Sequence, residues 1–219
     1  MLHSYRKKDH TNEDPKTSAI FENLMLLPDN VFWNVLRNSC YGGESLPRCA
    51  GVLLDYEFWC QWNSDGTGNS YYVEPDVFFR FEEFDVVIEA KYSEDKGQYE
   101  EQWMRELQAY HNEFEEEGKK VFLIAVGGNV SNKKEEKMDN VYKCSWHSLL
   151  VNVNKYKKEL DQVRGISDYN VSARLRLLDN IILAFNINNI YDIKCFAPMK
   201  TRETYIAPES LERMCNFFK

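Results

Sequence analysis

The sequence predicts an α/β fold in which a helix precedes a three-stranded meander, a crossover helix and a further strand, with a C-terminal helical extension. Three observations predict it. Three runs rich in β-forming residues follow one another between residues 52 and 92. A helical apolar repeat comes next, and the continuous apolar run at 121–126 is typical of a strand that is covered on both faces.

The first predicted elements lie in residues 17–92. A short amphipathic helix begins at Thr17 and ends at Pro28, and a second apolar stretch at 31–36 continues as another helix. Strands are predicted over 52–62, 71–81 and 85–92, with a turn-rich segment after the first and an acidic turn after the second. Sequential strands joined in this way form an antiparallel meander.

The second half of the chain alternates helices with strands. A strong helix between Gly97 and Gly118 carries aromatic and aliphatic residues at steps of three or four, and it leads to the strand at 121–126. A short strand at 141–144 is followed by Ser145, a plausible N-cap for a helix from Trp146. The extension contains a last helix from Pro208 and, before it, a long helix marked by Val171, Leu175, Leu178, Ile182 and Phe185.

Composition favours one principal domain in a reducing compartment. The chain has 219 residues, of which 43% are hydrophobic and 28% charged, as in ordinary globular proteins. We expect a flexible leader at 1–16, the main domain at 17–160 and the helical extension, packed on the core, at 161–219. No secretory signal or membrane span is evident, so we expect a cytoplasmic protein with no membrane partner. Six cysteines without a CxxC pair predict free thiols.

Charged residues on the predicted strands are the chemical signal. Glu89 and Lys91 share one face of an apolar strand, where burial of either charge is costly unless it is paired or bound to a metal. Antiparallel pairing around the acidic turn sets Asp76 roughly level with Glu89. Two carboxylates at one level repel each other unless a cation lies between them, and oxygen donors favour Mg²⁺ or Mn²⁺.

The pattern Pro75-Asp76, twelve intervening residues, then Glu89-Ala90-Lys91 resembles the signature of the PD-(D/E)XK, or restriction endonuclease-like, nuclease superfamily. Residues 17–126 follow the order of elements in that superfamily's core. The resemblance implies that Asp76 and Glu89 bind Mg²⁺ or Mn²⁺ together with the Ala90 carbonyl. It also implies that Lys91 acts on the attacking water.

Three further residues are weaker candidates on the same resemblance. Glu22 corresponds to an acidic residue that many members carry on the first helix, and Gln102, with Glu106 one turn later, to a polar position near the site. Each has a structural alternative: all three residues can line the solvated faces of their helices. Likewise, Glu89 and Lys91 can form a same-face ion pair on a half-exposed sheet.

The implied function is a Mg²⁺-dependent nuclease acting on DNA, within an antiviral defence, repair or mobile-element system by analogy with the family. A formal net charge of −8 and a pI near 5.2 oppose unaided binding to phosphates. We therefore expect a protein partner that supplies basic surface or targeting, and a homodimer is compatible with the sequence. Two alternatives stay open: an RNA-directed nuclease, and a catalytically silent nuclease-fold module for protein assembly or nucleic-acid binding.

Overall fold

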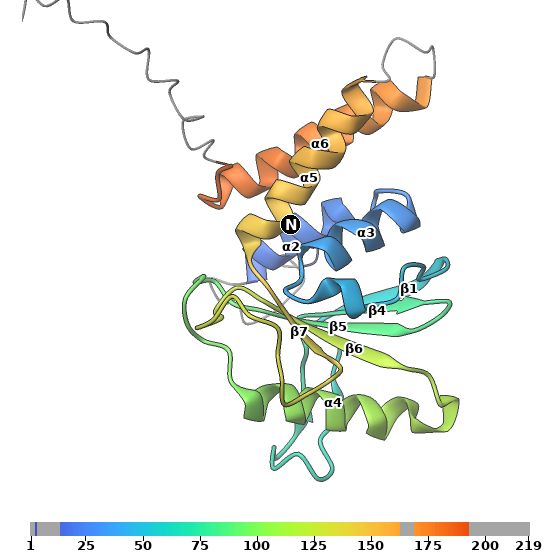
Figure 1. Ribbon diagram of the computed structural model, residues 1–219. Coiled ribbons are helices and arrows are strands. Elements are labelled where there is room, and N and C mark those ends of the chain that lie inside the picture. The colour runs from blue at the N-terminus through green and yellow to red at the C-terminus, as the bar shows by residue number, and fades with distance from the viewer. Residues whose placement is uncertain (1–2, 4–13, 163–168, 193–219) are drawn as a thin grey trace, which may run out of the picture.

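A five-stranded mixed sheet forms the centre of the molecule (Figure 1). The computed structural model describes His3 and residues 14–162 and 169–192. In spatial order the strands are β1 (Leu53–Phe58), β4 (Val77–Phe81), β5 (Asp85–Ala90), β6 (Val121–Val126) and β7 (Val141–Cys144). The first three are antiparallel, and β5, β6 and β7 are parallel. The predicted meander, and the parallel strand reached by a crossover helix, are therefore confirmed.

Helices cover both faces of the sheet, which gives three layers (Figure 1). One face carries four helices: α2 (Asp14–Leu24), α3 (Asp29–Ser39), α5 (Trp146–Gln162) and α6 (Tyr169–Ile187). The other carries α4 (Glu100–Phe114) and a small hairpin of β2 (Trp62–Asn63) and β3 (Tyr72–Val73). Two short 3-10 helices, η1 (Gly43–Ser45) and η2 (Glu115–Glu117), complete the described elements.

Alternation along β5 divides the core in two. Val86, Ile88 and Ala90 face the four-helix layer, whereas Val87 faces α4 and the hairpin. Every side chain of β5 is buried, in agreement with its apolar sequence. Glu89 shares the face of Val87 and is only 2% exposed. An acidic side chain is thus held inside the layer between the sheet and α4.

The predicted strands 52–62 and 71–81 are each divided in the structure, so the prediction of continuous strands was wrong. After β1 the chain turns at Trp59, whose φ of 54° lies in the left-handed region, and it then enters β2. β3 ends at Val73, because Pro75 has no N–H to donate to a sheet. Asp76 therefore lies in the break between β3 and β4, immediately before β4 begins.

The helix boundaries also differ from the prediction at the first helix. α2 begins at Asp14 rather than Thr17, and the buried Lys16 donates a hydrogen bond from Nζ to the Tyr92 carbonyl at 2.8 Å. Asp14 and Lys16 are thus buried and Pro15 between them is exposed. The rest of the expected leader, apart from His3, lies outside the described residues. Helices α5 and α6 begin close to their predicted positions, and Ser145 Oγ accepts the Ser148 N–H at 2.9 Å as an N-cap.

Helix α6 packs against α2 and α5, and its Leu178 and Phe185 belong to the same apolar cluster as those helices. The predicted last helix from Pro208 lies outside the described residues. Within the described ranges Cys40, Cys49, Cys60 and Cys144 are free thiols. No helix in these ranges combines the length and the apolar character that a membrane span requires.

A buried ionic network fixes the start of β5. Asp85 is fully buried, and its Oδ2 accepts hydrogen bonds from the Tyr110 hydroxyl at 2.8 Å and from Arg80 Nη2 at 3.3 Å. Lys119 Nζ lies 3.1 Å from Oδ1 of the same carboxylate. Strands β4 and β5, helix α4 and the segment before β6 are therefore joined at one buried charge.

Asp85→Ala should lower the free energy of unfolding by about 3 kcal/mol or more, because it leaves the cations of Arg80 and Lys119 without their buried partner. Urea unfolding followed by circular dichroism measures the change. Asp55→Ala, at an exposed position on β1, is the matched control and should shift stability by about 0.5 kcal/mol or less. Equal stabilities of the two variants would contradict the assigned role of Asp85.

Candidate active site

Asp76 and Glu89 meet at the end of the β4–β5 pair. The last paired residues are Val77 and Ile88, so the next position of the register sets Asp76 opposite Glu89. Asp76 Oδ2 accepts the Ala90 backbone N–H at 2.7 Å, which fixes this carboxylate against the end of β5. Both acidic side chains lie on the α4 side of the sheet.

Glu89 is held by donors from two elements. The Lys91 ammonium, two residues along the chain, donates to Glu89 Oε1, and Gln102 Nε2 from α4 donates to the same oxygen at 2.6 Å. Gln98 Nε2 donates to the Glu89 backbone carbonyl at 2.9 Å, and Trp103 Nε1 holds Gln98 in turn at 2.7 Å. The structure therefore brings Glu89, Lys91 and Gln102 together, as well as Gln98, which the sequence analysis did not identify.

Glu106 is a second buried carboxyl group in direct contact with Glu89. It lies one turn after Gln102 on α4, is 2% exposed and shares a hydrogen bond with Glu89. Burial raises the pKa of Glu106 well above its usual range, and the negative charges of Glu89 and Asp76 act in the same direction. Its Oε2 has no hydrogen-bond partner among the described residues. The alternative that Glu106 lines a solvated helix face is therefore wrong.

Trp59, which no sequence pattern indicated as a site residue, supports Asp76 from the other side. Its indole N–H donates to Asp76 Oδ1 at 3.2 Å, and its backbone N–H donates to the Asp76 carbonyl at 3.2 Å. A bulky residue in the left-handed region costs about 1–3 kcal/mol, and such conformations cluster at functional sites. Only the break between β1 and β2, which the sequence did not reveal, places Trp59 beside Asp76.

Lys91 depends on two glycines for its position. A Cβ atom on Gly128 would lie 2.8 Å from Cβ of Lys91, and one on Gly127 would lie 2.8 Å from its carbonyl oxygen. Both glycines have positive φ angles. The Trp146 indole N–H donates to the Lys91 carbonyl at 2.8 Å. The Gly127-Gly128 turn after β6 therefore makes room for the backbone and side chain of Lys91.

Glu22 lies on the α2 side of β1. Its Oε1 accepts hydrogen bonds from Ser18 Oγ and from the backbone N and Nδ1 of His3, the latter two at 2.7 and 3.0 Å. The His3 ring stacks on Phe58 with 4.4 Å between ring centroids. His3 thus links Glu22 to Phe58 at the end of β1, next to Trp59.

The donor chemistry suits a hard divalent cation. Asp76 and Glu89 contribute carboxylate oxygens at one register position, and the buried Oε2 of Glu106 adds an oxygen without a protein partner in the described chain. As the side chains stand, the described residues contain no group of three or more His, Cys, Asp or Glu arranged to hold a metal ion. Asp76 and Glu89 are instead engaged by Trp59, Ala90 N–H, Lys91 and Gln102.

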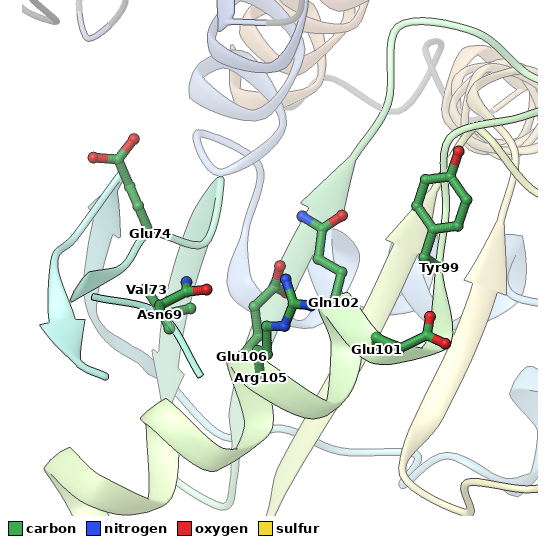
Figure 2. Close-up of a pocket in the computed structure, with 8 residues that line it drawn as sticks. All are labelled: Asn69, Val73, Glu74, Tyr99, Glu101, Gln102, Arg105 and Glu106. Atoms are coloured by element: carbon green, nitrogen blue, oxygen red, sulfur yellow. The ribbon is translucent and has the colours of Figure 1, made fainter. Parts of the chain in front are cut away.

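A cavity of about 370 Å³ opens beside these residues, between α4 and the β2–β3 hairpin (Figure 2). Gln102 and Glu106, the two α4 residues that contact Glu89, belong to its lining. Asn69 and Glu74, from the hairpin side, lie across the cavity from Arg105, and Tyr99 lies at the start of α4 (Figure 2). The candidate site therefore continues into a space large enough for part of a ligand.

Glu106→Gln tests the state of this buried carboxyl group. Because its pKa is raised on folding, protonated Glu106 contributes stability that is complete below the ordinary pKa of 4.5 and is lost as the pH rises through the folded value. Gln keeps the shape and an N–H donor at every pH. The variant should therefore melt at increasingly higher temperature than wild type as the pH is raised, by roughly 2–4 °C for each kcal/mol recovered.

Thermal unfolding in EDTA at several pH values provides the measurement. Glu116→Gln, at an exposed position in η2, is the matched control and should follow the wild-type profile. Parallel pH profiles of wild type and Glu106→Gln would show that the group is ionised in the folded protein.

Comparison with known proteins does not assign the chain to a family. No family model matches the sequence. The chain is 29% identical over 160 residues, 72% of its length, to an uncharacterized protein of Pasteurella multocida (strain Pm70), and it spans about half (52%) of that relative. Among solved structures it is similar to the small subunit of the heterodimeric restriction endonuclease R.BspD6I, with 14% identity and a TM-score of 0.25. That match covers 80% of this chain and 96% of the subunit.

Proposed function

We propose that the chain is a metal-dependent nuclease of the PD-(D/E)XK type that hydrolyses phosphodiester bonds. One observation carries the proposal: Asp76 and Glu89 occupy facing positions at the end of β4 and β5, with the Lys91 ammonium bonded to Glu89. The motif residues that are separated in the sequence are thus adjacent in space. The order of a helix, an antiparallel meander, a crossover helix and a parallel strand supports the same proposal.

The cation would be held by Asp76 and Glu89 with the Ala90 carbonyl, and Mg²⁺ or Mn²⁺ suits these oxygen donors. When bound, such an ion lowers the pKa of a coordinated water and offsets charge on the phosphate. The two carboxylates are already fixed in place, Asp76 by Trp59 and by the Ala90 N–H, and Glu89 by Gln102. These hydrogen bonds keep both carboxylates at the end of β4 and β5, where the cation would be bound.

The Lys91 ammonium has a role separate from that of the metal ion. The Lys91 side chain is 16% exposed and its ammonium is bonded to Glu89, so it lies at the boundary between the buried carboxylate and solvent. From there it stabilises negative charge that develops on a phosphate and orients the attacking water. Gln102 fixes the Glu89 oxygen that Lys91 also contacts. Glu22 stays a weaker candidate for this site, because its described contacts are with Ser18 and His3.

DNA is the substrate we propose first, with RNA as the alternative. The net charge of −8 opposes binding to a phosphate backbone and favours a protein partner that delivers the substrate. A defence, repair or mobile-element setting is consistent with such a partner. The same charge favours the second candidate function, a nuclease-fold module without catalysis.

Cleavage of plasmid and linear DNA in Mg²⁺ or Mn²⁺ tests the proposed function. Asp76→Ala, Glu89→Gln and Lys91→Met should each lower the rate by about a hundredfold or more, because each removes a group that acts on the reacting phosphate or its cation. The matched controls Glu116→Gln and Lys158→Met, both at exposed positions, should cleave like wild type. RNA substrates are included in the same series.

One combination of results would contradict the proposed nuclease activity. Absence of cleavage on every substrate, together with absence of Mn²⁺ binding by calorimetry, would establish the non-catalytic module. Cleavage that survives all three substitutions would indicate a contaminating enzyme.

Trp59→Phe tests whether the strained residue positions Asp76. In the wild-type structure the ring centroids of Trp59 and Phe58 are 5.6 Å apart. The change keeps an aromatic ring beside Phe58 and removes the indole donor to Asp76 Oδ1. We expect the Mg²⁺ concentration for half-maximal cleavage to rise about tenfold, the equivalent of one hydrogen bond to a charged group. Trp33→Phe removes an indole donor that serves the distant Pro47 carbonyl and should leave the Mg²⁺ midpoint unchanged. Identical midpoints for the two variants would rule out a positioning role.

A further inference from the structure

The cavity next to the candidate active site continues along α4. Its inner end includes Glu106 and Gln102, which contact Glu89. A second cavity, of about 310 Å³, lies farther along the helix and includes Met104 and Gln108. Arg105 and Glu101 line both cavities. The two cavities therefore adjoin at these two residues of α4, and together they are called the groove below.

The charges along this groove favour a ligand that is neutral in one part and anionic in another. Arg105 is the one cation among the residues that line the inner cavity, and it makes no hydrogen bond or ion pair with the described residues. The carboxylates of Glu74 and Glu101 line the same space. Carboxylates repel a phosphate by about 4 kcal/mol for each charge at 4 Å in a partly solvated setting. Without a bound metal ion, Arg105 is therefore the position along this lining that favours a phosphate.

The deeper part offers surfaces that suit a nucleobase. Tyr99 lies at the rim with 64% of its surface exposed, so its ring is accessible for stacking. Asn69 and Glu74 belong to the lining on the hairpin side, and carboxylate and amide oxygens accept hydrogen bonds from exocyclic amino groups. At the inner end the buried Oε2 of Glu106 has no described partner. These groups recognise a flat, neutral ring that carries hydrogen-bond donors.

We infer that the groove binds an unpaired strand of nucleic acid, with one base in the inner cavity and the adjoining phosphate on Arg105. The inference rests on the proposed function and names the substrate class of that site. A cavity of about 370 Å³ has room for one nucleoside-sized group. The preferred substrate is therefore single-stranded, or carries an unpaired nucleotide beside the scissile phosphate, since extracting a paired base from a duplex costs energy.

A binding experiment tests the groove without cleavage. Single strands of DNA and of RNA, each with one 2-aminopurine at a different position, are titrated with the protein while Ca²⁺ replaces Mg²⁺. Stacking on Tyr99 should quench the fluorescence of the analogue at one position. Tyr99→Leu should abolish the quenching, and Arg105→Gln should weaken binding about tenfold. Arg174→Gln, at an exposed position on α6, should bind like wild type.

Cleavage of matched oligonucleotides in Mg²⁺ completes the test. The rate for a single strand, and for a duplex with one unpaired nucleotide, should exceed that for the matched duplex at least tenfold. Arg105→Gln and Tyr99→Leu should reduce this preference while melting like wild type, because both side chains are exposed. Comparison of the DNA with the RNA oligonucleotides shows whether the site prefers deoxyribose or ribose.

The results separate the two proposals. Cleavage of the matched duplex as fast as the single strand, with no position-dependent quenching, would contradict strand binding in the groove. It would not contradict the proposed nuclease activity. Position-dependent quenching that both variants lose, without cleavage of any substrate and without Mn²⁺ binding, would support strand binding in the groove and overturn the proposed nuclease activity. Quenching that persists in Tyr99→Leu and Arg105→Gln would place the strand elsewhere and overturn the inference.

Discussion

A carboxylate withdrawn from water needs compensating partners, and the candidate site is organised around this need at Glu89. The side chain is 2% exposed, and its oxygens are bonded to Lys91, Gln102 and Glu106. These partners come from the end of β5 and from two turns of α4. The position of α4 on the sheet therefore determines whether Glu89 can remain buried, and the cavity beside α4 follows from the same packing.

The hydrogen-bond donors around Glu89 and Asp76 also explain how these acidic residues can stay buried. Gln98 binds the Glu89 carbonyl and Trp59 binds both the side chain and the carbonyl of Asp76. Each of these residues satisfies a group that would otherwise be buried without a partner. Glu106 is the exception, since one of its oxygens lacks a partner in the described chain and its pKa is raised. Polar groups left in this condition are concentrated where a ligand is to be bound.

Much of the sheet could be predicted from sequence, because alternation and apolar runs report directly on burial. The same alternation, with a hairpin at Glu82-Glu83, was enough to predict Asp76 level with Glu89, which is the register position the structure gives. The breaks after β1 and before β4 could not be predicted, because Trp59 and Asp76 lie in segments with strong β-propensity on both sides. The burial of Glu106 depends on the β2–β3 hairpin that packs on α4, a tertiary contact that a helical pattern does not report.

The two buried acids of β5 also control how the strand can pair. Asp85 and Glu89 share the face that is turned toward α4, while Val86, Ile88 and Ala90 enter the aromatic layer under α2 and α3. A shift of one residue against β4 or β6 would exchange the faces and drive both carboxylates among Phe21, Phe79 and Trp146. Misregistered pairings are thereby made far less stable than the native one. Buried charges therefore lie at both ends of β5, at the candidate site and in the ionic network around Asp85. During folding they disfavour any pairing in which this central strand is shifted by one residue.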